Sequence, residues 1–353
     1  MSTPRYRLQP YAGSKTRFEC PGCGQRRSFT RWLDTHTGEL LPSHLGYCNR
    51  TDKCGYATSP YDKDEAGKRY VDTLHALPQV RVRPAQHRPP QKRPLRLIPQ
   101  EIVARSMQGY AHNVFTTLLQ RHFGGDVADD LIRRFEIGTS AHWPGATVFW
   151  QRDAQGRMRG GQVVLFDEDG HTAKKVGADG VTRRCTTWVH TSLAHVYDRS
   201  GKPRPEWLQA YLDPAHEVKR SPSLYGMGQL TALSPGSPVA IVEAPKTAVL
   251  CTPYFPQFTW LAVGALDYLN AERLHPLKEY PITLYPDASE HGRAYAKWCA
   301  KADELRSMGF RIAVSDILEK QATPSQKKVG IDLADVLLEN WAGYPLNWDA
   351  DSL

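Results

Sequence analysis

The sequence lacks long apolar runs and is short of acidic charge. No stretch approaches the roughly 18 consecutive apolar residues that a membrane-spanning helix needs. The N-terminus has no charged segment followed by an apolar one, so we expect a cytoplasmic protein without a membrane partner. Lys and Arg outnumber Asp and Glu by 45 to 37, which gives a net charge of +8 over 353 residues. This surplus favours an acidic polymer as the partner, although ordinary solubility charge would also explain it.

Cysteine is scarce, and four of the seven cysteines form two close pairs near the N-terminus. Two residues separate Cys20 from Cys23, and Cys48 and Cys54 follow after a gap of 24 residues. Two turns of this kind supply one tetrahedral set of thiolates for Zn²⁺. Because four protein ligands leave no open position for chemistry, the pattern predicts a structural zinc ion.

The remaining cysteines and the wide second pair need separate interpretation. Five residues lie between the cysteines of the second pair, so His44 or Asp52 could replace one thiolate. Cys185, Cys251 and Cys299 are expected to be packed or surface thiols, because a reducing compartment disfavours disulfides.

A segment without acidic residues divides the chain. Between Asp72 and Glu101, prolines alternate with arginines and lysines. Prolines at this density disfavour helices and central strands and predict an extended linker, whose basic charges could contact phosphates or serve solubility alone. We expect a zinc ribbon, a Pro/Arg-rich linker, an α+β middle domain and an α/β domain at 1–60, 61–99, 100–235 and 236–353, respectively.

Basic residues in two regions are candidates for nucleic-acid or phosphate binding. In the ribbon, Arg26 and Arg27 could hold a phosphate backbone while Trp32 stacks on an unpaired base, although some aromatic side chains must form the small core. In the middle region, a solvated face and a nucleic-acid or triphosphate track explain four further basic residues equally well. These are Lys174, Lys175, Arg183 and Arg184.

Hydrophobic periodicity predicts the fold of the rest of the chain. Residues 102–135 have apolar side chains near helical spacing, and residues 146–166 have the pattern of an antiparallel hairpin. After them, short apolar strands alternate with helices, which is typical of a parallel sheet covered on both faces. The predicted strands are 238–242, 258–263, 281–285 and 311–314. The fold class is therefore α/β with a small β zinc ribbon and a mixed α+β region in front.

Acidic residues follow the strands of this predicted sheet. Open parallel sheets bind ligands at the carboxyl ends of their strands, where Glu243 and Asp287 fall, and Asp332 and Asp335 are expected just after another strand. Carboxylates gathered there repel one another unless a hard cation such as Mg²⁺ or Mn²⁺ lies between them. Asp332 could instead cap a helix and Asp287 could be a turn residue, whereas an acid directly after a buried strand has no such local explanation.

These motifs resemble the toprim domain of bacterial primases, topoisomerases and some nucleases. With the cysteine ribbon in front, the order of modules is similar to that of the bacterial replicative-type primase. The segments at 138–147, 224–230 and 242–248 also resemble an uncharacterised toprim-like family of bacterial mobile elements. This resemblance covers most of the chain and implies a primase-core-like middle domain before a toprim-like domain.

The resemblance also implies roles for individual residues. Glu243 would act as general acid/base or metal ligand, and Asp287, Asp332 and Asp335 would hold the metal ion. Lys246 lies one turn into the following helix and could face a phosphate.

Two positions depart from the toprim pattern. Ser289 stands where a second aspartate is usual, with Glu290 or Glu243 as possible compensation. Ala244 stands where glycine commonly follows the glutamate.

As a whole, the resemblance implies a primase-type nucleotidyltransferase that makes short primers on single-stranded DNA from nucleoside triphosphates. A replicative helicase is a candidate partner. The alternatives are a toprim nuclease with the same metal site, and a non-catalytic DNA-binding factor for replication or mobilisation of a mobile element, which Ser289 favours. A topoisomerase is disfavoured, because the chain is short for a strand-passage gate and no tyrosine stands out as a nucleophile.

Overall fold

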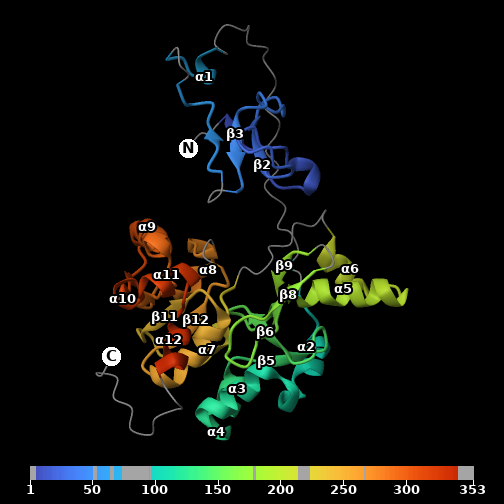
Figure 1. The fold of residues 1–353 in the computed structure, drawn as a ribbon, viewed down its shortest axis with the longest axis vertical. Coiled ribbons are helices and arrows are strands. Elements are labelled where there is room, and N and C mark those ends of the chain that lie inside the picture. The colour runs from blue at the N-terminus through green and yellow to red at the C-terminus, as the bar shows by residue number, and fades with distance from the viewer. Residues whose placement is uncertain are drawn as a thin grey trace. The chain divides into compact units, whose positions relative to one another are not determined.

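The chain forms two compact units, residues 1–91 and 92–353 (Figure 1). The division falls inside the predicted linker, whose residues 74–94 lie outside the described part of the chain. Within that part, no helix combines the length and apolarity needed to cross a membrane. The computed structural model describes residues 5–50, 54–63, 67–73, 95, 97–177, 180–213, 223–265 and 268–340.

The first unit is an antiparallel sheet of four short strands in the order β1-β2-β3-β4. Its elements are β1 (Tyr6–Leu8), η1 (Ser14–Thr16), β2 (Phe29–Asp34), β3 (Gly46–Cys48), β4 (Ala57–Thr58) and α1 (Tyr70–Thr73). So small a sheet has room for only two clusters of buried side chains. Phe29 packs against Cys20 and Cys48 in one, and Tyr6 packs near Leu41 in the other. The predicted small β ribbon is confirmed.

The second unit begins with helices and an antiparallel sheet in the order β10-β7-β6-β5. Helices α2, α3 and α4 lie in the stretch predicted to be helical, 102–135. β6 and β7 confirm the predicted hairpin. Between β7 and β10 the chain forms a separate two-stranded hairpin, β8–β9. The elements are α2 (Gln100–Ser106), η3 (Tyr110–His112), α3 (Val114–Phe123), α4 (Gly125–Arg134), β5 (Ile137–Ser140), β6 (Ala146–Arg152), β7 (Met158–Val164), β8 (Lys174–Val176), β9 (Thr182–Arg184), β10 (Thr186–Trp188), α5 (Val189–Ser200), α6 (Glu206–Leu212) and η4 (Met227–Ala232).

A parallel sheet follows, in the order β12-β11-β13-β14. All four strands lie where the sequence predicts them, with helices between them (Figure 1). The elements are β11 (Val239–Val242), α7 (Pro245–Tyr254), β12 (Thr259–Ala262), α8 (Ala271–Leu274), η6 (His275–Leu277), β13 (Ile282–Leu284), η7 (Glu290–Gly292), α9 (Arg293–Ser307), β14 (Ile312–Val314), α10 (Ile317–Gln321), α11 (Pro324–Val329) and α12 (Leu333–Asn340).

Alternate residues of β11 point to the two faces of the parallel sheet, and both faces are buried. Val239 and Ile241 belong to a cluster with Trp298 of α9. Ala240 and Val242 belong to a second cluster that contains α7 and α12. The prediction of an α/β sheet covered on both sides is therefore confirmed.

The second cluster also joins the two sheets of this unit into one core. It continues from the parallel sheet into α3, α4 and the antiparallel strands. Tyr225 fixes the junction, because its backbone pairs with Ala262 of β12 while its buried hydroxyl donates to the carbonyl of Phe135 at 2.8 Å. The side chains at the ends of both sheets are therefore held by a common scaffold.

Phe149 of β6 lies at the centre of this junction, with aromatic contacts to Phe115, Phe166 and Tyr225. We expect Phe149→Ala to lower the free energy of unfolding of the second unit by about 3–5 kcal/mol, because it leaves a cavity in a packed core. Val176→Ala, at a side chain that is 70% exposed, is the control and should change it by less than about 0.5 kcal/mol. Denaturant titration measures both, and a Phe149→Ala value near the control would contradict a shared core.

Candidate functional site

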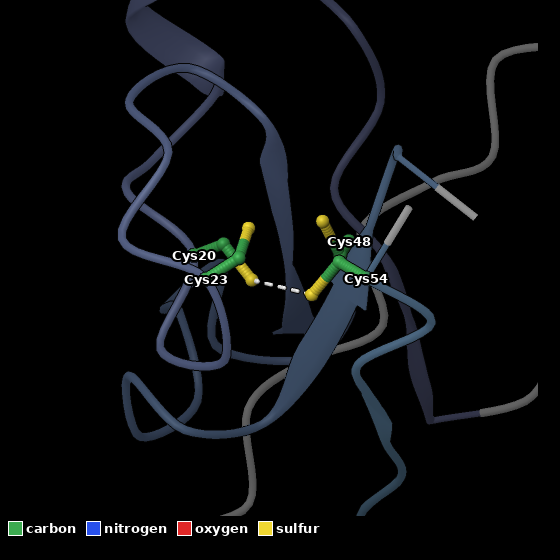
Figure 2. Close-up of side chains that lie close together, drawn as sticks. All are labelled: Cys20, Cys23, Cys48 and Cys54. Atoms are coloured by element: carbon green, nitrogen blue, oxygen red, sulfur yellow. Dashed lines mark hydrogen bonds between the residues drawn. The ribbon is translucent and has the colours of Figure 1, made fainter. Parts of the chain in front are cut away.

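The four N-terminal cysteines converge as predicted. Their sulfur atoms all lie within 4.8 Å of one another, and Figure 2 shows the two pairs facing each other. Cys20 and Cys48 are buried, which holds the cluster inside the ribbon. His44 is exposed and does not belong to the cluster, and Asp52 lies outside the described residues. Four converging thiols are the donor set of a structural zinc site, so the residues present fit this ion.

Glycine makes the two cysteine turns possible. Gly24 and Gly55 follow the second cysteine of each pair and have φ angles of +66° and +65°. Side chains rarely adopt this left-handed region. At the first turn, a hydrogen bond from the backbone of Gln25 lowers the pKa of Cys23 to about 7, which favours the thiolate that a metal needs.

The ribbon residues predicted to bind nucleic acid differ in their accessibility. The Arg26 side chain is 88% exposed and its Nε lies 3.8 Å from Glu19, while Arg27 is exposed on the same turn. Trp32 is half-buried, and its indole N–H donates to the carbonyl of Thr58 at 3.0 Å. Both arginines are therefore available to a partner, whereas much of the Trp32 ring serves the ribbon core.

In the second unit, the four predicted acids line one cavity of about 490 Å³ at the carboxyl edge of the parallel sheet. Glu243 directly follows β11, and Asp287 follows β13 by three residues. Burial raises the pKa of Asp287 well above its usual range, and the negative charges of Asp332 and Glu243 raise it further. The charges of neighbouring acids therefore add to the effect of burial on Asp287.

Asp332 and Asp335 lie at this edge, but the prediction that they come just after a strand is wrong. They do not follow a strand, because α10 and α11 lie between β14 and Asp332. Instead, Ala288 after β13 donates its N–H to the carbonyl of Ile331 at 2.9 Å, which places the start of α12 beside Asp287.

All carboxylate oxygens of these two aspartates have donors. Asp332 Oδ1 accepts from the N–H of Asp335 at 2.9 Å, and Asp335 Oδ2 accepts from the N–H of Asp332 at 3.0 Å. This reciprocal pair caps α12, as the sequence allowed for Asp332. The other two oxygens face α7, where Thr247 donates to Asp332 at 2.7 Å and Lys246 Nζ lies 2.6 Å from Asp335 and 3.4 Å from Asp332.

Lys246 is buried with a positive charge. Burial opposes that charge, but Asp332 and Asp335 outweigh it and raise the pKa of Lys246 above its usual value. Its ammonium therefore faces two carboxylates in the same cavity as Glu243.

The cavity lining also contains basic side chains. Lys174 and Arg184 are paired across β8 and β9, and both line the cavity. Their neighbours Lys175 and Arg183 form the adjacent pair and are absent from the lining. Because successive strand residues point to opposite sides, the hairpin offers one basic pair to the cavity and the other to its outer face.

The position that departs from the toprim pattern has a local role. Ser289 Oγ accepts from the N–H of Ala294 at 2.8 Å and so helps to begin α9. Glu290 is exposed, with an oxygen 4.0 Å from Arg293, and does not line the cavity. Neither residue adds a carboxylate to the acidic edge.

Two residues of the site were not singled out from the sequence. Thr247 contacts Asp332, and His171 lies with its Nδ1 3.6 Å from Asp335. The position of Thr247 beside Lys246 in the first turn of a helix after an acid was a usable signal. His171 lies in a turn between strands, and no periodicity marks it.

The zinc site leads to a direct test. We expect Cys20→Ser to lose the bound zinc ion and to make the first unit sensitive to protease, because three thiolates hold the metal less tightly and the ribbon has little other core. Zinc content per chain and limited proteolysis measure this. Cys299→Ser, at a free cysteine outside the cluster, is the control and should keep its zinc. Full zinc occupancy in Cys20→Ser would show that the four thiols are not the ligand set.

Comparisons with known families match both units. Residues 4–69 match a family model described as a zinc beta-ribbon finger, and residues 113–288 match one described as a domain of unknown function (DUF6371). The second match includes Glu243 and Asp287 and ends before α12. The search of the curated proteins finds no match.

Among solved structures, the chain is similar to the primase fragment of the bacteriophage T7 primase-helicase protein, with 12% identity, a TM-score of 0.36 and coverage of 92% of this chain and 94% of that one. It is also similar to a DnaG primase catalytic domain bound to single-stranded DNA, with 14% identity, a TM-score of 0.36 and coverage of 68% and 82%. The E. coli primase catalytic core gives 15% identity, the same TM-score and coverage of 68% and 81%. Similarity at this level does not establish an activity.

Proposed function

We propose that this protein is a primase-type nucleotidyltransferase, which makes short primers on single-stranded DNA by metal-dependent phosphoryl transfer. The observation that carries the proposal is one cavity lined by four acids and by Lys174 and Arg184. Nucleoside triphosphates need both, because a divalent ion bridges them to carboxylates while basic side chains bind the remaining phosphate charge.

We infer two different roles for the four acids at the carboxyl edge. We assign Glu243 and Asp287 as the ligands of Mg²⁺ or Mn²⁺, in the manner of a toprim site. When bound there, the ion supplies charge stabilisation for the transferring phosphoryl group. Asp332 and Asp335 hold the start of α12 against α7, so they set the shape of the edge on which Glu243 stands.

The bond changes follow from this placement. The 3′ hydroxyl oxygen of the growing primer bonds to the α-phosphorus of the incoming nucleotide, and the bond to the β-phosphate oxygen breaks to release pyrophosphate. Glu243 would accept the proton of the attacking hydroxyl. Lys174 and Arg184 would bind the leaving phosphates.

The zinc ribbon would hold the template. Its exposed Arg26 and Arg27 can neutralise backbone phosphates of single-stranded DNA, and the exposed edge of Trp32 can contact a base. A replicative helicase is the partner that such a primase would require to expose its template.

We expect Glu243→Gln and Asp287→Asn each to abolish primer synthesis without unfolding the protein, because each removes a carboxylate ligand and leaves the volume unchanged. Glu304→Gln and Asp303→Asn, at half-exposed and exposed acids of α9, are the matched controls and should keep full activity.

The assay contains single-stranded template, Mg²⁺ and labelled nucleotides, and gel electrophoresis resolves the products. Shortened template would indicate a nuclease, and bound but unchanged template would indicate a DNA-binding factor without catalysis. Full primer synthesis by both site variants would remove these residues from the mechanism.

The β8–β9 hairpin gives a second test with an internal control. We expect Lys174→Gln or Arg184→Gln to raise the KM for nucleotide about tenfold or more, because each loses a charge-assisted hydrogen bond worth about 1.5–3 kcal/mol. Lys175→Gln and Arg183→Gln, on the outer face, should leave this KM unchanged and weaken DNA binding with a smaller salt dependence. Equal KM effects from the two faces would contradict a nucleotide site inside the cavity.

A further inference from the structure

Lys246 occupies a position between two carboxylates of the acidic edge. Its Nζ lies 2.6 Å from Asp335 Oδ1 and 3.4 Å from Asp332 Oδ2. The side chain is buried, as are both aspartates, with residue exposures of 7%, 6% and 8%. An ammonium at these distances offsets the negative charge of the two carboxylates, as a bound metal cation would.

The remaining contacts leave little room for a metal ion at these aspartates. Each of their four oxygens accepts from a backbone N–H, from Thr247 or from Lys246. His171 Nδ1 lies 3.6 Å from Asp335. A divalent ion at these two aspartates would have to displace the ammonium. Glu243 and Asp287 line the same cavity.

Charge balance agrees with a single divalent ion. With all four carboxylates ionised, as metal binding requires of its ligands, the edge would carry −4, and Lys246 would reduce this to −3. One Mg²⁺ would bring the edge to −1, whereas two would make it +1 before Lys174 and Arg184 are counted. Because Lys174 and Arg184 already serve the phosphates, a second metal ion is not needed for charge.

We propose that the Lys246 ammonium is a resident cation that takes the place of a second divalent ion, so that the edge binds one divalent ion through Glu243 and Asp287. Asp332 and Asp335 are then positioning residues, which act through α7 and Lys246. This inference rests on the proposed function, because it concerns the metal ion of the same site.

The test counts bound Mn²⁺ on the full-length, zinc-loaded protein by electron paramagnetic resonance of the free ion. The wild type is expected to bind one Mn²⁺ per chain. Lys246→Met removes the charge at nearly constant volume and is expected to bind two, because Asp332 and Asp335 then need another cation. Lys246→Arg keeps the charge and is expected to bind one. The double variant Lys246→Met with Asp335→Asn is expected to return to one.

The outcomes separate this inference from the proposed function. Two Mn²⁺ in the wild type, or one in Lys246→Met, would overturn the resident cation and leave the catalytic proposal standing. No Mn²⁺ in the wild type would overturn the proposed metal-dependent activity and, with it, this inference. If Lys246→Met folds only when Mn²⁺ is added, with two ions bound, the result supports the inference. If Lys246→Met does not fold at all, Lys246→Gln, which keeps a hydrogen-bond donor, is measured in its place. It is also expected to bind two Mn²⁺, and a count of one would overturn the resident cation.

Discussion

The repulsion among carboxylates at one edge of the parallel sheet is the constraint on which the second unit depends. Four parallel strands have their carboxyl ends on the same side, so any acid that follows a strand is brought towards the others. Burial makes the repulsion stronger, because little water remains to screen it. Lys246 offsets part of this repulsion, and the backbone N–H groups that begin α12 offset another part. Glu243 and Asp287 are the two acids to which we assign the metal ion.

The scaffold holds this unfavourable arrangement because it is packed from both sides. The cluster around Phe149 and Tyr225 joins the antiparallel and parallel sheets, so the basic hairpin and the acidic edge belong to one core. Side chains carried by both sheets therefore line one cavity, in which a charged ligand would meet acidic and basic residues together.

Much of this could be predicted from the sequence where the signal is local. The cysteine spacing predicted the zinc ribbon, and the apolar runs predicted all four parallel strands, because both depend on nearby residues. The position of Glu243 after β11 was equally visible. The position of Asp332 could not be predicted from the sequence. Two helices, α10 and α11, separate it from the last strand, and a hydrogen bond between Ala288 and Ile331 brings the start of α12 to the edge. Nor could the sequence decide which two of the four hairpin cations face the cavity, since that depends on the pairing register of β8 and β9.

The two unusual features of the acidic edge point in the same direction. Ser289 provides a hydroxyl that begins α9 where the toprim pattern has a further carboxylate, and Lys246 places a positive charge between two of the acids that remain. A serine in place of a carboxylate and a lysine beside two carboxylates both lower the negative charge that a bound cation would have to balance. Glu243 and Asp287 line the same cavity as Lys174 and Arg184, so the edge keeps acidic and basic side chains within reach of one charged ligand.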